Sequence, residues 1–201
     1  MEIKFADSFA KSLKTLIRHH TWWYKTYETI RYDIPRFIRN IWVFRKSLWN
    51  TYWWDHHGPL MHLQIALDKM ATEIETRGLE VDESRLKKVA KMRRAAQLIK
   101  NYNEDLYIEM AEAELGELVL HAWEFEDVPD QPGYSQLVDK DTPEEKEHNH
   151  KVFDRAREIG EAEWAELWEI LKGQDYTKFQ KTEDVSWDAQ FDGSGIRGWW
   201  D

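Results

Sequence analysis

Hydrophobic residues recur every three or four positions along most of the chain, which is the spacing of one face of an α-helix. The clearest stripe consists of Leu60, Leu63, Leu67, Met70 and Ile74. A stripe this narrow predicts a helix packed on a partner helix, and Gly78 after Arg77 is a typical C-terminal signal. The same spacing predicts further helices over residues 8–32, 35–54, 82–100, 104–123 and 143–171.

Proline and glycine mark the expected breaks. Pro35 interrupts the first apolar stripe and suits the first turn of a new helix, and Gly58-Pro59 is expected to end that second helix. Residues 101–103 read as a short link, whereas residues 124–143 read as a long loop. With no run of alternating strands, the pattern predicts an all-α fold of five to six helices, in a mostly antiparallel bundle with an irregular C-terminal tail.

Two parts of different character are predicted within one helical domain over residues 1–173. Residues 1–59 form a basic aromatic part, and residues 60–173 form an acidic bundle. Residues 174–201 are expected to be a tail that docks on this body, because the paired Trp199-Trp200 is costly to leave in water. Gly193-Ser194-Gly195 then reads as the flexible turn that lets the tail fold back.

Charge reinforces this division. The 201 residues carry a net charge of −10, yet residues 1–62 hold ten Lys/Arg against five Asp/Glu, and residues 63–201 hold eighteen against thirty-three. Two interpretations stay open: the two parts pair internally, or the basic part holds an anion site. The chain has no cysteine, no apolar run of membrane-spanning length and no signal-peptide pattern at its start, so we expect a cytoplasmic protein that does not enter a membrane.

The candidate ligand site lies in the basic part, where arginines alternate with aromatic residues and histidines. Guanidinium groups bind phosphate with two parallel hydrogen bonds, and aromatic rings stack on bases. This pattern predicts a small anionic, nucleotide-like ligand; alternatively, the rings are core and the arginines their solvated flank. Extended nucleic acid is disfavoured by the negative net charge. The candidate residues are Arg31, Arg36, Arg39, Arg45, Trp42, Tyr52, Trp53, Trp54, His56 and His57.

Metal sites are weighed and not predicted. Asp55-His56-His57 resembles the signature of a phosphoesterase family, but that family places it after a strand of an α/β sheet. Adjacent histidines on a helix are also expected to point apart. The pairs Glu117/His121 and Glu144/His148 share helical faces, and a solvated surface is the favoured interpretation of both. We therefore expect neither a metal nor a cofactor.

One enzyme remains as an alternative. Glu109 and Glu112, with Asp68 and Glu73 opposite them, resemble the carboxylates with which all-α nucleotide pyrophosphatases hold Mg²⁺ along two helices. Because helix surfaces are commonly this acidic, a metal-dependent nucleotide hydrolase is the second hypothesis, not the first.

Two stretches resemble an uncharacterised family of small hypothetical proteins of large tailed phages. They are Tyr52-Trp53-Trp54-Asp55 and the ending from Phe191 through Gly193-Ser194-Gly195 to Trp199-Trp200-Asp201. The resemblance implies a phage-type protein acting in the cytoplasm of an infected bacterial host cell. Our leading hypothesis is a non-enzymatic, homo-oligomeric binding protein that sequesters a nucleotide-like host defence signal or binds a host protein. A structural protein of the virion or replication apparatus is a further alternative.

Overall fold

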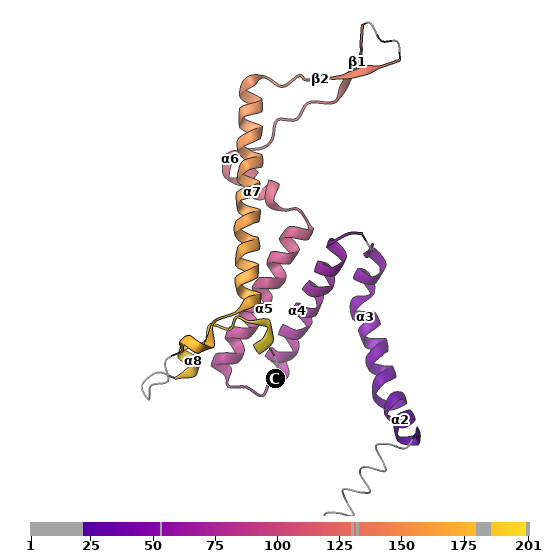
Figure 1. Ribbon diagram of the computed structural model, residues 1–201, viewed down its shortest axis with the longest axis vertical. Helices are drawn as coiled ribbons and strands as arrows, with labels where there is room; N and C mark the ends of the chain where they lie inside the picture. The colour runs from indigo at the N-terminus through magenta and orange to yellow at the C-terminus, as the bar shows by residue number, and fades with distance from the viewer. Residues whose placement is uncertain (1–21, 53, 130, 132, 180–185, 200–201) are drawn as a thin grey trace, which may run out of the picture. The chain divides into compact units, whose positions relative to one another are not determined.

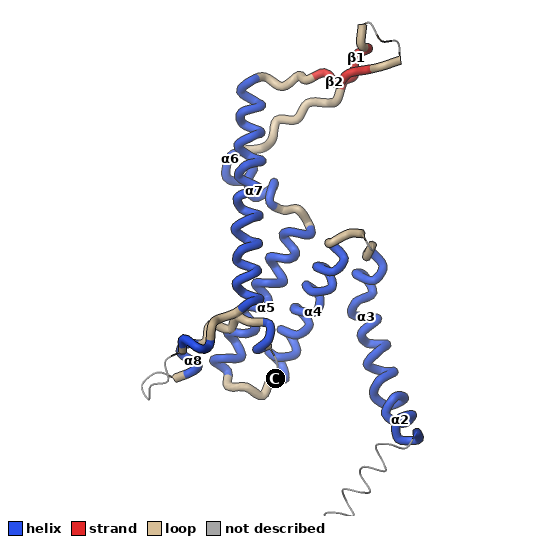
Figure 2. Tube along the Cα trace, viewed as in Figure 1, coloured by secondary structure: helices blue, strands red, loops and turns tan. Residues whose placement is uncertain are grey.

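The computed structural model describes residues 22–52, 54–129, 131, 133–179 and 186–199. Helices make up most of this part and its strands form one small hairpin, which confirms the all-α class (Figures 1 and 2). No helix in these ranges is long and apolar enough to cross a bilayer. The chain divides into two compact units, unit 1 (residues 1–54) and unit 2 (residues 55–201). The sequence-based boundary between the basic aromatic part and the acidic bundle lies a few residues later, after residue 59.

The described part of unit 1 is one helical run in three parts: α2 (Trp22–Glu28), the π-helical turn η1 (Thr29–Asp33) and α3 (Ile34–Asn50). Pro35 was expected to follow a break, but the run continues through it. The N–H of Ile34 bonds to the carbonyl of Thr29, five residues back, and Pro35 then occupies the first turn of α3. A π turn absorbs the missing N–H of a proline without ending the helix.

The junction to unit 2 differs from the prediction. α3 ends at Asn50, four residues earlier than expected, and Thr51 is extended. Gly58-Pro59 does not end a helix but lies inside the first turn of α4 (His57–Arg77). Proline is tolerated there because the first N–H groups of a helix have no intrahelical partner. The predicted end of α4 is confirmed, since the N–H of Gly78 bonds to the carbonyl of Ile74.

The main core of unit 2 joins three helices: α4, α5 (Asp82–Asn103) and α7 (Pro143–Lys172). Leu67, Met92 and Leu167, one from each helix, are almost fully buried in it. The apolar stripe predicted for α4 is therefore a core face. On α7, Phe153 and Trp164 follow the same spacing but are 47% and 48% exposed. α5 also runs through the link expected at residues 101–103.

The helix predicted over residues 104–123 is shorter than expected. The chain turns at Asp105, and α6 (Tyr107–Leu115) ends where Gly116 adopts a φ of 103°. A positive φ favours glycine and stops the helix, although apolar residues continue after it. α6 packs on α7 in a second core, where the absent side chain of Gly160 makes room for the ring of Tyr107.

The long loop expected over residues 124–143 contains a β-hairpin. Strand β1 (Glu124–Asp127) pairs antiparallel with β2 (Ser135–Val138), with Glu124 opposite Val138 and Asp127 opposite Ser135. Strands of four residues, exposed on both faces, carry no buried–exposed alternation, so a hydrophobic pattern does not reveal them. The long-loop interpretation of residues 124–143 therefore missed this hairpin, while the all-α class stands.

The tail runs through η2 (Tyr176–Lys178), α8 (Trp187–Gln190) and η3 (Ile196–Gly198). Trp199 is 4% exposed and belongs to the main core, and its indole N–H donates to the carbonyl of Gly193 at 2.7 Å. At Gly193, φ is 86° and a Cβ would lie 2.3 Å from the backbone of Lys87. Trp199 thus packs on its own chain, while Trp200 lies outside the described residues.

Thr142 caps α7, as its position before Pro143 predicts. Its side chain accepts from the N–H of Glu145, whose carboxylate accepts from the N–H of Thr142. We expect Thr142→Ala to lower the free energy of unfolding of unit 2 by about 1 kcal/mol, because a cap acceptor is lost. Urea unfolding measures this. Thr142→Ser keeps the acceptor and is the control; equal losses in both variants would contradict the assignment.

Arg94 on α5 and Glu166 on α7 form a two-pronged ion pair, at 2.8 and 2.6 Å. The hydrogen bonds from Arg94 lower the pKa of Glu166 below its ordinary value of 4.5. The pair therefore stabilises the folded chain above pH 4.5, and this contribution disappears as the pH falls through the lowered pKa. Because both groups are exposed, Glu166→Gln should cost about 0.5 kcal/mol at pH 7 and nothing in strong acid, as urea unfolding at both pH values would show. An undiminished difference in acid would contradict the pairing.

Candidate functional sites

The arginines predicted to bind a ligand lie on the surface of unit 1. Arg31 is in η1, and Arg36, Arg39 and Arg45 are in α3 with Trp42; all five side chains are exposed. The interpretation of these rings as buried core is therefore wrong for Trp42. Trp53 lies outside the described residues.

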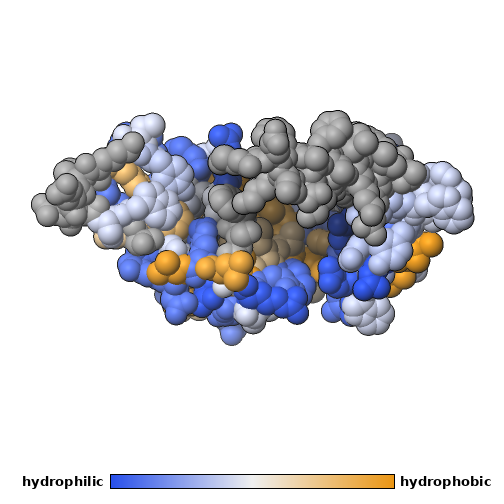
Figure 3. Space-filling model, turned by 90° about the horizontal axis from the view of Figure 1, so that it is seen from below, coloured by the Kyte–Doolittle hydropathy of each residue, from blue (hydrophilic) through white to orange (hydrophobic). Residues whose placement is uncertain are grey.

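One face of α3 is apolar and exposed, and we call it the α3 surface. Its residues are 44–89% exposed and follow helical spacing: Ile34, Phe37, Ile38, Ile41, Trp42, Leu48 and Trp49. α3 carries four cationic residues and no acidic one. Figure 3 shows pale aromatic and orange aliphatic side chains at the surface of unit 1, at the right of the view. Exposed apolar patches of this kind mark interaction sites on soluble proteins.

The arginines of α3 do not converge. Arg36 and Arg45 are nine residues apart, which corresponds to roughly 13.5 Å along a helix and about half a turn around it. Arg36 pairs with Asp33 at 2.7 Å. The guanidinium of Arg45 lies 4.2 Å from the centre of the Trp42 ring and donates to the Trp42 carbonyl. α3 alone therefore does not bring these two cations to one phosphate.

The aromatic residues after α3 continue the exposed face. Tyr52 and Trp54 are both exposed, and their rings lie 5.3 Å apart between centres. Trp49, the last tryptophan of α3, is 89% exposed. A shallow hollow lies beside Arg36 and Phe37. In the described part of unit 1, the predicted site is thus an open helical surface, whereas the predicted site residues His56 and His57 belong to unit 2.

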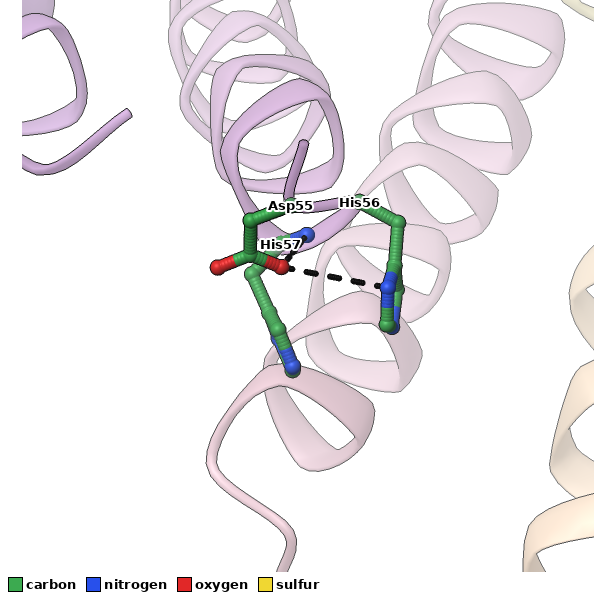
Figure 4. A group of neighbouring side chains, drawn as sticks. All are labelled: Asp55, His56 and His57. Atoms are coloured by element: carbon green, nitrogen blue, oxygen red, sulfur yellow. Dashed lines mark hydrogen bonds and ion pairs between the residues drawn. The ribbon is translucent and has the colours of Figure 1, made fainter. Parts of the chain in front are cut away.

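Asp55, His56 and His57 gather at the start of α4 (Figure 4). One oxygen of Asp55 accepts from the N–H of His57 at 2.9 Å and lies 3.8 Å from Nδ1 of His56. The two imidazole rings stack at 4.4 Å, although we expected adjacent histidines to point apart. The expectation that these side chains diverge is therefore wrong for this pair, whose first member is the residue before α4.

Two residues from the end of α5 hold these rings. The hydroxyl of Tyr102 lies 3.0 Å from Nε2 of His56, and Oδ1 of Asn103 lies 3.1 Å from Nδ1 of His57. No local sequence pattern indicates these two residues, because they are 46 positions away and reach the histidines through the packing of α5 on α4.

A second hollow, the tail pocket, has a volume of about 320 Å³. Tyr176, Trp187 and Phe191 supply aromatic walls, and Arg197 supplies a cationic group. Lys88 also lines the pocket, but it is ion-paired with Glu80, another lining residue. The rings of Trp187 and Phe191 stack at 4.5 Å. Most of these residues lie in the tail, which the sequence marked only as polar with scattered aromatics.

The acidic residues proposed for a hydrolase are not brought together. Glu73 pairs with Lys69 and Arg77 of its own helix, and Glu112 accepts from the N–H of Leu118. In the ranges that the structure covers, the group of three or more potential metal ligands is Asp55-His56-His57 alone. The geometry therefore gives the Mg²⁺ site no support.

Of the two predicted helical Glu/His pairs, only Glu144/His148 lies on a helix. Glu117 and His121 follow the end of α6, so they do not share a helical face; His121 instead lies 3.3 Å from Glu145. His148 is on α7 with Glu144, and its Nε2 lies 2.9 Å from the carbonyl of Glu117. Neither pair is a ligand set.

Comparison with known proteins identified no family for the chain. No family model, curated protein or solved structure matches the chain.

Proposed function

We propose that the chain is a non-enzymatic binding protein of phage type, which docks on an acidic host protein through the α3 surface. The observation that carries this proposal is an exposed apolar helix face accompanied by four cations and no acid. The phage setting and the bacterial cytoplasm rest on the resemblance of Tyr52-Trp53-Trp54-Asp55 and of the C-terminus.

The shape of this surface favours a protein over a small ligand. Small-molecule sites are concave and cover most of their ligand. Arg36 and Arg45 lie on different sides of α3, and the guanidinium of Arg45 lies against the Trp42 ring, 4.2 Å from its centre. An amphipathic helix instead supplies side chains at positions i, i+3, i+4 and i+7, which is how helices dock in the apolar groove of a partner. Phe37, Ile41 and Leu48 follow this spacing.

The charge of unit 1 favours an acidic groove. Residues 1–54 hold ten Lys/Arg and four Asp/Glu, a net charge of +6, in a chain whose net charge is −10. Arg36, Arg39 and Lys46 lie on the polar side of α3, where they would face acids at the rim of the groove. Such pairs accelerate association and select the partner by charge. The homo-oligomer expected from the sequence remains a prediction.

Affinity purification from bacterial cells tests the proposal, with the full chain compared with Arg36→Glu/Arg39→Glu. We expect one acidic protein in stoichiometric amount with the unaltered chain and its loss with the double variant. Arg77→Glu/Arg157→Glu makes the same charge change on exposed residues of unit 2 and should retain it. Two outcomes would contradict the proposal. One is equal recovery of the acidic protein with the unaltered chain and both double variants. The other is that the α3 surface binds vesicles of anionic and zwitterionic phospholipid instead of a protein.

A nucleotide-like ligand is the second candidate, and the tail pocket favours it. A base would stack on Trp187, and Arg197 would face the phosphate. Native mass spectrometry with a nucleotide panel tests this candidate: a bound nucleotide lost in Trp187→Ala supports it, and no bound species contradicts it.

A further inference from the structure

We propose that Asp55, His56 and His57 bind one divalent transition-metal ion. One ligand atom from each residue lies within 4.8 Å of the others. Two imidazoles and one carboxylate suit Zn²⁺ and its neighbours, and leave a fourth position for water or for a group of a bound partner. All three residues belong to unit 2, so the site does not depend on the α3 surface.

The partners from α5 hold the imidazoles in the form that a metal requires. Because Oδ1 of Asn103 accepts, Nδ1 of His57 carries the proton and Nε2 keeps its lone pair. Tyr102 likewise occupies Nε2 of His56, which leaves Nδ1 toward Asp55. Metal-binding histidines typically have their other ring nitrogen held by a hydrogen-bond partner in this way.

The carboxylate of Asp55 lies beside His56, with one oxygen 3.8 Å from Nδ1. A metal ion bound to Nδ1 would take the place of the proton that otherwise faces this carboxylate. The positive end of the α4 dipole opposes a cation here, and the negative charge of Asp55 offsets it.

A modest movement completes the site. Tetrahedral ligands at about 2.0–2.1 Å from Zn²⁺ are about 3.4 Å apart, whereas the ligand atoms here lie within 4.8 Å, so they would approach by up to about 1.4 Å. Asp55 and His56 precede the first residue of α4, and the side chain of His56 is largely exposed. Their side chains would rotate to bring the ligand atoms together, and an ion would enter from solvent.

Titration of the full chain with Zn²⁺ alone, in competition with a chromogenic chelator, tests the site. We expect one ion per chain, and at least about 100-fold weaker binding in His56→Ala and in His57→Ala. Tyr102→Phe and Asn103→Ala remove no ligand and should cost about 10–100-fold, the usual effect of losing an orienting partner. Asp55→Asn should weaken binding while its side-chain oxygen still caps α4, so it separates metal binding from folding.

His150→Ala is the matched control, because His150 is an exposed histidine on α7, remote in sequence from the site. It should bind Zn²⁺ like the unaltered chain. The proposal would be overturned if Zn²⁺ affinity fell equally in His150→Ala and His57→Ala. It would also be overturned if Zn²⁺ binding did not saturate, or if replacing His56 and His57 left it unchanged.

Discussion

Trp199→Ala is expected to lower the free energy of unfolding of unit 2 by about 3–5 kcal/mol, the usual cost of removing a large buried ring. Trp199 is 4% exposed among residues of α4, α5 and α7, and its N–H donates to the carbonyl of Gly193. The variant loses the ring and leaves that carbonyl without its donor. Urea unfolding, followed by circular dichroism, measures the loss.

Trp168→Ala is the matched control for this prediction. Trp168 lies on α7 but is 63% exposed, so its removal should change the free energy of unfolding by less than about 0.5 kcal/mol. Trp199→Phe keeps an aromatic ring but lacks the N–H, so its loss of unfolding free energy should lie between those of Trp199→Ala and Trp168→Ala. If Trp199→Ala and Trp168→Ala unfold alike, the tail does not contribute to the core.

Trp49→Ala is expected to weaken the complex with the host protein by about 30- to 1000-fold, equivalent to roughly 2–4 kcal/mol. Tryptophans at the centre of an interface commonly contribute this much. Trp49 is 89% exposed, so the variant should fold like the unaltered chain. Isothermal titration calorimetry with the purified partner measures the change in affinity.

Leu79→Ala serves as the control for Trp49→Ala, because Leu79 is 94% exposed in unit 2, outside the α3 surface. It should bind the partner with unchanged affinity. Unchanged affinity in Trp49→Ala would instead show that this end of α3 is not part of the interface.

The sequence predicted the long helices of unit 2 because their stripes are regular and their ends are marked. Gly78 ends α4, and Thr142 starts α7. The errors occurred where a single backbone conformation decides the structure. Gly116 can sit inside a helix at a cost of about 1 kcal/mol, and only its observed φ of 103° shows that α6 stops there. At Pro35 the sequence indicates an interruption but does not distinguish a π turn from a break.

The candidate sites could be predicted only in part, because composition is visible in the sequence but exposure and packing are not. The basic, aromatic character of α3 is visible in its composition, but its exposure depends on whether the rest of the chain covers it. The start of α4 was misplaced by about three residues, and the stacking of His56 on His57 depends on side-chain orientations that helical spacing does not predict. Tyr102 and Asn103 reach the histidines through helix packing, which no local pattern encodes.

Photo-cross-linking in bacterial cells tests the central claim most directly, with p-benzoylphenylalanine placed at Trp49 in one variant and at Leu79 in the other. We predict a discrete cross-link from position 49 to one acidic host protein, lost when Arg36→Glu/Arg39→Glu is added, and none from position 79. Cross-links from position 49 that reach only this chain or only lipid, or equal products from both positions, would contradict the account.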